Sequence, residues 1–343
     1  MSETITAQKE IFPGVLGQQK AKKLMAKVLG SGRLPHALLF RGPEGVGKQL
    51  FARRLAAVIN CRNLAERPCG QCPSCKKYHS GNHPDFMVIE PEKGSIKIDR
   101  IRELCRTLTY PPYESQMRVI LLEDVHTMRR EAANALLKTL EEPPENNLLI
   151  LTADASRQVL PTILSRCQTM PFYPLSFADT ARILQTDEHT GPEEAVLLAR
   201  LAEGSPGRAV LFREAGLLPL LEDLVVFLSD PSADEPVNTG KALEFAEKIA
   251  ALKDELVSFL GLLKIWCRDL LLLADGQPQL AERGIILHKN QHQHRKDWSS
   301  VQIFAKLAAL DRALHQLNRN CNRGLVCEVL IFNLLSSRTG HHD

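Results

Sequence analysis

The chain has 343 residues, of which 44% are apolar and 24% are charged, and its formal net charge is +3. This composition is typical of globular proteins with roughly two or three domains, and it excludes a disordered, collagen-like or coiled-coil chain. The near-neutral charge and the 5% of aromatic residues weigh against a strongly basic nucleic-acid binder, while a weak or shared contact with DNA stays open.

No segment of the sequence predicts a membrane span or a secretory signal. The most apolar stretch, residues 256–273, is interrupted by Lys264, Arg268 and Asp269, whereas a transmembrane helix needs about 20 predominantly apolar residues. The first ten residues lack a basic region followed by an apolar core. We therefore expect a cytoplasmic protein that makes no membrane contact.

Short apolar runs alternate with helical patterns between residues 37 and 174. Runs of this kind predict an α/β fold, a parallel sheet covered by helices on both faces. Apolar residues at helical spacing predict one helix capped by Asp99 and another that ends before Pro143. The four predicted strands are Ala37–Phe40, Phe86–Ile89, Val119–Leu122 and Leu148–Leu151.

A phosphate-binding loop follows the first predicted strand. Gly42, Gly45, Gly47 and Lys48 fit the pattern G-x-x-x-x-G-K, and a helix is expected over 49–59. Glycine N–H groups and the helix N-terminus would cradle phosphates, and Lys48 would reach the β- and γ-phosphates. The alternative is a glycine turn before a helix that binds no ligand.

The residues that would hold Mg²⁺ and activate water depart from the usual pattern. Gln49 stands where Ser or Thr would ligate the metal. Glu123 and Asp124, at the end of the third apolar run, reverse the expected order of a metal-binding Asp and a following Glu. An ordinary charged strand end is the alternative for this pair. We therefore expect ATP and Mg²⁺ to bind weakly or not at all, with weak or absent hydrolysis.

Four of the nine cysteines form the pattern C-x₇-C-x₂-C-x₂-C, and they are Cys61, Cys69, Cys72 and Cys75. Two x₂ loops can present sulfurs to one tetrahedral ion, so the spacing predicts a closed, structural Zn²⁺ site. Free buried thiols are the alternative. Lys76, Lys77 and His79 follow the cluster, either as a solvated basic edge or as a phosphate contact.

Strand signals fade after Pro174, and three short helices are expected over residues 177–185, 192–203 and 206–214. A polar linker is expected at 229–238, and Leu-rich helices from residue 217 are interrupted by a polar loop at 284–298. The expected domains are a P-loop domain at 1–174 with a zinc module at 61–75, a three-helix domain at 175–216 and a helical domain at 217–343.

The order of several segments resembles the bacterial clamp-loader branch of the AAA+ proteins. These are Pro35–Phe40 before the P-loop, the cysteine cluster after its helix, Asn134–Pro144, Ser165–Cys167 and Gly204–Arg208. The resemblance is dense over residues 11–210 and weaker beyond them.

The resemblance implies an AAA+ domain, a helical lid and a helical collar. It implies that five subunits, including gamma/tau motor and delta subunits, form an open hetero-pentameric ring through their collars. Such a ring opens the sliding clamp and places it on primer-template DNA for DNA polymerase III. The implied location is the cytoplasmic replisome at the nucleoid.

Two types of family member carry the zinc module: the ATP-hydrolysing gamma/tau motor and the delta-prime, or stator, type. The irregular Gln49, Glu123 and Asp124, together with the chain length, favour the stator type. The motor type is the first alternative. A zinc-ribbon nucleic-acid binder with an unused P-loop is the second, and the low charge and few aromatics weigh against it.

The resemblance also assigns roles to individual residues. Arg166 resembles an arginine finger that would act on a neighbouring subunit's ATP, with a surface arginine as the alternative. Arg208 resembles the lid arginine that contacts nucleotide in cis, with lid packing as the alternative. Lys138 is a candidate contact to DNA or a neighbouring subunit, or an exposed lysine paired with a helix glutamate. The histidines and basic residues at 288–296 are interpreted as a solvated loop, with a metal or anion patch as the alternative.

Overall fold

The computed structural model describes residues 11–336, apart from 93, 156, 188–189, 231–237, 276–297 and 320. The chain forms two compact units, Met1–Asp179 and Thr180–Asp343. Within the described residues, no helix combines the length and the apolar character needed to cross a membrane. The predicted patch at 288–296 lies outside the described residues, as does most of the predicted linker and of the predicted polar loop.

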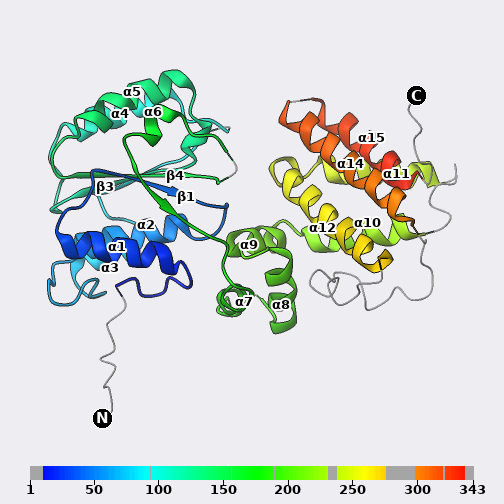
Figure 1. Ribbon diagram of the computed structural model, residues 1–343, viewed down its shortest axis with the longest axis horizontal. Helices are drawn as coiled ribbons and strands as arrows, with labels where there is room; N and C mark the ends of the chain where they lie inside the picture. The colour runs from blue at the N-terminus through cyan, green and yellow to red at the C-terminus, as the bar shows by residue number, and fades with distance from the viewer. Residues whose placement is uncertain are drawn as a thin grey trace, which may run out of the picture. The chain divides into compact units, whose positions relative to one another are not determined.

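The first unit is built on a five-stranded sheet in the order β2-β3-β4-β1-β5, and all neighbouring strands are parallel (Figure 1). The four predicted strands are confirmed as β1 to β4. A fifth strand was not predicted, because it lies at the edge, contains a proline and buries only Met170. The strands are β1 (Ala37–Arg41), β2 (Phe86–Ile89), β3 (Arg118–Leu122), β4 (Asn147–Ala153) and β5 (Gln168–Pro171).

Helices cover both faces of this sheet, as the apolar runs predict (Figure 1). One face packs against α1 (Gln19–Ser31), α2 (Lys48–Ile59) and α3 (Pro73–His79). The other face packs against α4 (Ile98–Leu108), α5 (Arg130–Glu141) and the short α6 (Pro161–Leu164). A 3₁₀ turn, η1 (Val125–Thr127), follows β3.

The expectation that Asp99 caps a helix is wrong. Helix α4 begins at Ile98, so Lys97 is the N-cap residue and Asp99 lies inside the first turn. A carboxylate at that position interacts favourably with the helix dipole without capping the first N–H groups. The second predicted helix, α5, does end at Glu141, shortly before Pro143 and Pro144.

Aromatic packing fixes the phosphate-loop helix on the sheet. The Phe51 ring stacks on Phe12 with centroids 4.5 Å apart, and it meets the rings of Phe40 and Phe172 edge-on at 5.7 Å and 5.3 Å. Fully buried aromatic side chains of this kind each contribute several kcal/mol of apolar burial. This cluster therefore joins α2 to strand β1 and to the chain that follows β5.

A buried ion pair closes the connection between α4 and β3. The Asp85 carboxylate is fully buried and accepts hydrogen bonds from the backbone N–H groups of Tyr113, Glu114 and Ser115 at 2.6, 2.9 and 2.9 Å. The Arg118 guanidinium lies 3.9 Å from Asp85 and donates to the carbonyls of Thr107, Tyr110 and Pro111. The loop is thereby held by two buried charges.

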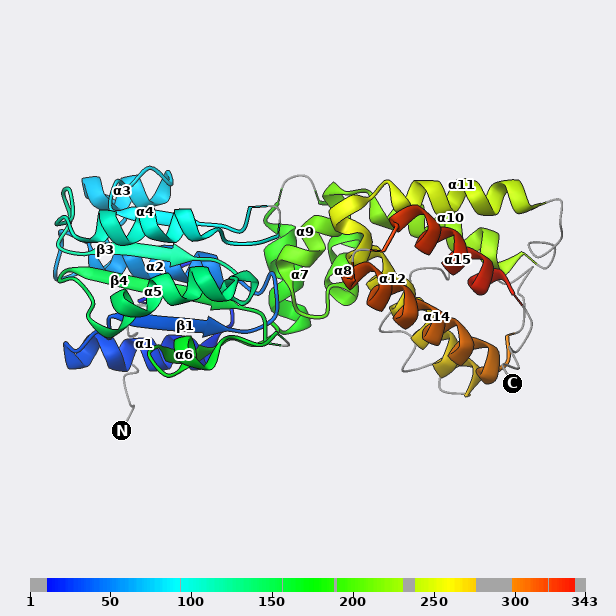
Figure 2. The same ribbon diagram turned by 90° about the horizontal axis from the view of Figure 1, so that it is seen from above.

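The second unit is entirely helical in its described part, and a single buried apolar cluster runs from Ala181 to Leu335. The three predicted short helices are confirmed, within two residues at one end, as α7 to α9. Helix α15 packs beside α11 and α14 (Figure 2). The helices are α7 (Phe177–Gln185), α8 (Pro192–Leu201), α9 (Pro206–Glu214), α10 (Leu217–Ser229), α11 (Thr239–Ala250), α12 (Leu256–Ala274), α14 (Ser300–Asn318) and α15 (Arg323–Leu335), with a 3₁₀ turn η3 (Lys253–Glu255).

The substitution Asp85→Asn is expected to lower the free energy of unfolding by about 3 kcal/mol, because it removes the partner of a buried arginine and turns an amide N–H₂ toward N–H donors. Urea unfolding measures the change. The control Asp99→Asn alters a carboxylate whose side chain is 85% exposed, and about 0.5 kcal/mol or less is expected. Equal effects of the two variants would contradict the role given to Asp85.

The same carboxylate predicts the acid dependence of stability. Burial alone would raise the pKa of Asp85, but the three backbone N–H donors and Arg118 outweigh it, so its pKa lies below the ordinary 3.8. Its contribution is therefore fully present above pH 3.8 and is lost as the pH falls through the lowered folded-state pKa. The stability difference between the wild type and Asp85→Asn should shrink below that pH.

Candidate functional site

The phosphate loop lies between the carboxyl end of β1 and the start of α2, as the motif requires. Gly45 and Gly47 have φ angles of 73° and 92°, which a side chain would strain. Gly42 is needed for a different reason, since a Cβ there would lie 2.5 Å from the carbonyl oxygen of Phe172. The three glycines therefore permit a tight loop against the chain that leaves β5.

The Lys48 side chain is hydrogen-bonded to the P-loop backbone. Its Nζ donates hydrogen bonds of 2.7 Å to each of the carbonyls of Gly42 and Pro43. Burial lowers the pKa of Lys48, an effect opposed by the nearby carboxylates of Asp124 and Asp154. To reach a phosphate, the ammonium group would have to exchange these carbonyl partners for phosphate oxygens.

The two irregular acidic residues lie at the same edge of the sheet as the P-loop, because β3, β4 and β1 are parallel neighbours. Glu123 is half-buried, and its Oε1 is buried without a hydrogen-bond partner. Burial raises the pKa of Glu123, as do the carboxylates of Glu90 and Asp124, and a hydrogen bond from the Gln49 side chain lowers it. Gln49 and Glu123 therefore lie close enough to influence one another.

Asp124 is turned outward by its backbone. Its φ of 46° is in the left-handed region, and its N–H donates to the hydroxyl of Thr152 at 3.1 Å. The side chain is 43% exposed and lies 4.0 Å from Nδ1 of His126. Burial lowers the pKa of His126, so this imidazole is held in its neutral form. The reversed Glu-Asp order therefore places a glutamate inside and an aspartate outside.

Two further residues at this edge carry no signal in the sequence. Gln18 bridges the P-loop to the chain after β5: its Nε2 donates to the carbonyls of Val46 and Tyr173, and its Oε1 accepts from Tyr173 N–H. His126 lies in η1 with a buried, unpartnered Nδ1. Gln18 owes its position to contacts between distant segments, which motif spacing does not contain.

Arg166 lies in the turn after α6 and is held by its own chain. Its Nε donates to the Glu141 carboxylate at 2.9 Å and Nη2 donates to the same oxygen, while Nη1 donates to Thr162 O and Ser165 Oγ at 3.0 and 3.1 Å. The side chain is 32% exposed. Among the described residues, all these partners belong to α5, α6 and the following turn, and none to the chain's own P-loop.

Arg208 belongs to the second unit. Its guanidinium lies 3.8 Å from Glu203 and 5.5 Å from the centre of the Phe212 ring. It also approaches α12, where a Cβ on Gly261 would lie 3.8 Å from its Nη2. Lys138 is exposed on α5. The contacts of Arg208 are those of a packed helix surface. Both the Arg208 guanidinium and the Lys138 ammonium group stay partly open to solvent.

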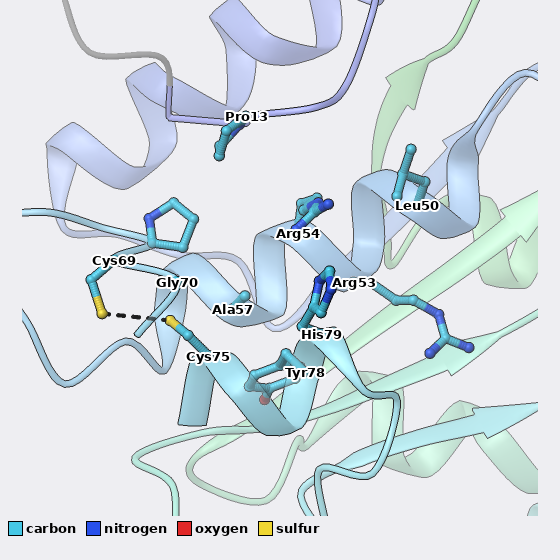
Figure 3. Close-up of a pocket in the computed structure, with 11 residues that line it drawn as sticks. Pro13, Leu50, Arg53, Arg54, Ala57, Cys69, Gly70, Cys75, Tyr78 and His79 are labelled. Atoms are coloured by element: carbon cyan, nitrogen blue, oxygen red, sulfur yellow. Dashed lines mark hydrogen bonds between the residues drawn. The ribbon is translucent and has the colours of Figure 1, made fainter. Parts of the chain in front are cut away.

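The four predicted zinc ligands come together at the start of α3. The four sulfurs all lie within 4.8 Å of one another, and those of Cys69 and Cys75 are 4.0 Å apart (Figure 3). Tetrahedral zinc with Zn–S bonds of about 2.3 Å requires sulfurs about 3.8 Å apart, so the cluster fits the ion. A bound Zn²⁺ would supply only cross-linking here, since four thiolates fill its coordination sphere.

Backbone N–H groups of the loop lie close to the cysteine sulfurs. N–H groups of Cys69, Cys72 and Cys75 each approach the sulfur of the preceding cysteine, at 3.4, 3.3 and 3.4 Å. Backbone hydrogen bonds from Cys72 and Gln71 lower the pKa of Cys69 to about 6, whereas burial raises the pKa of Cys75 to about 12. A bound cation would deprotonate the buried thiol as well.

Comparison with known proteins finds similarity to subunits of DNA polymerase III. A family model described as "DNA polymerase III, delta subunit" matches residues 17–176. The tau subunit of Escherichia coli DNA polymerase III is 37% identical over 217 residues, which are 60% of this chain and 33% of that protein. The delta' subunit of Bacillus subtilis is 37% identical over 185 residues, 54% of this chain and 56% of that protein.

A solved structure of a gamma-subunit-related protein from Thermotoga maritima aligns with 93% of this chain and 100% of that chain, at 21% identity and a TM-score of 0.47. The chain spans a third of the length of the Escherichia coli tau subunit and about half of the length of the Bacillus subtilis delta' subunit. Both kinds of subunit match equally well by identity.

The cysteine cluster predicts stoichiometric zinc in the purified protein. The substitution Cys72→Ser should remove most of the zinc and lower the melting temperature, because three ligands hold a structural ion much more weakly than four. Metal analysis by mass spectrometry and thermal unfolding measure both effects. The matched control is Cys321→Ser, which changes an exposed cysteine and should retain the metal. Far less than one zinc per wild-type chain, in protein kept away from chelators, would refute the site.

Proposed function

Because residues 17–176 belong to the clamp-loader family of AAA+ proteins, we propose that this chain is a delta-prime, or stator, subunit of a DNA polymerase III clamp loader. In this role it helps to load the sliding clamp on primed DNA during replication. It hydrolyses little or no ATP itself, and it completes a neighbouring subunit's ATP site with Arg166. The departure of Gln49, Glu123 and Asp124 from the usual metal and water positions, at the edge that carries the P-loop, is the observation that carries the choice of the stator type.

Three features of the phosphate edge support a weak or absent ATPase. Gln49 has an amide where Ser or Thr would offer a hydroxyl to Mg²⁺. Burial raises the pKa of Glu123 and so disfavours its charged form, which is the form that ligates a hard cation. Lys48 already has two carbonyl partners, which a phosphate would have to replace. The residues at the metal and water positions are therefore off-pattern, and the phosphate-binding lysine is engaged by its own loop.

The position of Arg166 supports action on a neighbour. Its side chain is partly exposed at the end of α6 and contacts Glu141 rather than the P-loop. An arginine that enters a neighbouring active site stabilises negative charge on the transferring phosphoryl group. Glu141 would then be its partner until the γ-phosphate of the neighbour's ATP replaces it.

The remaining assignments extend the same proposal. The AAA+ domain covers residues 1–174, with a structural zinc module at 61–75, and residues 175–216 form the lid. Residues 217–343 form the collar through which the chain joins motor and delta subunits in a hetero-pentameric ring. The ring's further partners are the sliding clamp and primer-template DNA. Within this proposal Arg208 contributes to lid packing, since it is engaged with Glu203 and Phe212.

A gamma/tau-type motor is the second candidate function. The observation that favours it is the match to a tau subunit, which is as identical to this chain as the delta' subunit is. In that case Glu123 and Asp124 would serve metal and water despite their order, and Lys48 would bind the β- and γ-phosphates.

ATP turnover by the purified chain separates the two candidates. We expect no Mg²⁺-dependent turnover above background, and no change on Lys48→Ala, because Gln49, Glu123 and Asp124 do not supply the usual groups for metal and water. A coupled phosphate-release assay measures both proteins. Turnover that disappears with Lys48→Ala would contradict the stator proposal and establish the motor.

Loss of Arg166 is expected to affect the assembled complex and not the isolated chain. Arg166→Ala should leave folding and assembly intact and slow hydrolysis at the neighbouring site by about tenfold or more, because a finger acts where charge develops. Arg166→Lys should restore little, since an ammonium group cannot replace the planar guanidinium.

Pre-steady-state phosphate release from the reconstituted complex measures this effect. Arg102→Ala is the matched control, because Arg102 is an exposed arginine of α4 that lies 3.7 Å from Asp99. Hydrolysis that is unchanged by Arg166→Ala, in a complex shown to be fully assembled, would remove the finger role.

A further inference from the structure

A cavity of about 600 Å³ lies between α2 and the zinc module (Figure 3). Its apolar wall includes Pro13, Leu50, Ala57 and Pro68. Two consecutive arginines of α2, Arg53 and Arg54, and His79 from the end of α3 add positive or polar groups. This volume is within the usual range of ligand-binding pockets, which is about 300–1,000 Å³.

Arg54 is the group that points to a ligand. Its Nε is buried and has no hydrogen-bond partner. The guanidinium lies against the backbone of Gly14, where an added Cβ would be 3.5 Å from Nη2. A buried donor without a partner costs roughly 1–3 kcal/mol, and more when it is charged. Arg54 is only partly buried and lines the cavity, so an anion that enters it would pair with the terminal nitrogens of a guanidinium whose inner Nε already lacks an acceptor.

The surroundings of the cavity are basic. Residues 50–80 contain six lysines and arginines and one acidic residue. Four thiolates around Zn²⁺ would add a net charge of about −2, which leaves an excess of positive charge even when Lys77 is paired with Glu114. The field around the cavity therefore favours a negatively charged ligand.

The residues that line the cavity favour some kinds of anionic ligand over others. A nucleic-acid strand usually stacks its bases on open aromatic rings. Here Tyr78 is buried and stacked on His83 at 4.0 Å, and Arg53 covers the ring of Phe86 at 5.3 Å. A small inorganic anion would leave the apolar wall without contacts. A carboxylate next to an apolar side chain would satisfy both the arginine and the wall.

We propose that this cavity is a docking site for an acidic peptide segment of a partner protein. A carboxylate of the segment pairs with the Arg54 guanidinium in the bidentate geometry that arginine favours. A neighbouring apolar side chain packs against Pro13, Leu50 and Ala57. None of the lining residues belongs to the P-loop at 42–48 or is Arg166, although Arg53 lies close enough to act electrostatically on Glu123. The proposal does not rest on the function proposed above.

Fluorescence anisotropy with the full-length, zinc-loaded chain tests the site. The probe is a fluorescein-labelled peptide of alternating aspartate and leucine, and its control has asparagine in place of each aspartate. Arg54→Met, which keeps the aliphatic stem, should weaken binding of the acidic probe by about tenfold or more. Arg102→Met, a change at an exposed arginine of α4, should leave affinity within about twofold.

A second variant covers the case in which Arg54→Met does not fold. Leu50 is 42% exposed on the cavity wall, so Leu50→Glu should repel the probe while zinc content and melting temperature stay unchanged. The proposal is overturned if the acidic probe does not bind the wild type, if it binds no better than its amide control, or if neither variant weakens it. Tighter, Arg54-dependent binding of a labelled oligothymidylate would overturn the peptide as the occupant.

Discussion

The parallel pairing of β4 with both β1 and β3 is the constraint on which the phosphate edge depends. Because all three strands run in the same direction, the P-loop, the Glu123–Asp124 pair and Thr152 must emerge at one edge of the sheet. The hydrogen bond from Asp124 N–H to Thr152 then connects the ends of β3 and β4. The opposite edge carries the loop held by Asp85 and Arg118.

Local patterns in the sequence were sufficient for the parts of the fold that short segments determine. The four apolar runs became strands, the glycine spacing became a P-loop, and the four cysteines came within metal-binding distance of one another. Strand β5 escaped prediction because only Met170 is buried there, so its stability comes from pairing with β1 rather than from its own residues. Gln18 and Glu141 gain their roles from partners far away in the chain, and no local pattern encodes such partners.

The cationic groups discussed for phosphate chemistry share one property: each is engaged with oxygens of its own chain. Lys48 binds two P-loop carbonyls, Arg166 binds Glu141, and Arg208 lies beside Glu203. Binding of a phosphate to any of them is therefore an exchange of partners, and its net free energy is far smaller than that of one new charged hydrogen bond. Arg54 differs, since its buried Nε has no acceptor to give up.

The loop between α4 and β3 has an unusual dynamic consequence. Tyr110 and Tyr113 expose 69% and 84% of their surface, which is typical of a mobile loop tip. The amides of Tyr113, Glu114 and Ser115 nevertheless donate to a carboxylate that is fully buried. Their exchange with deuterium then requires that Asp85 and Arg118 lose their contacts, so these amides open together with the core of the first unit rather than by local fraying. A surface that a solvent probe reaches easily is in this way as rigid on the timescale of hydrogen exchange as the sheet beneath it.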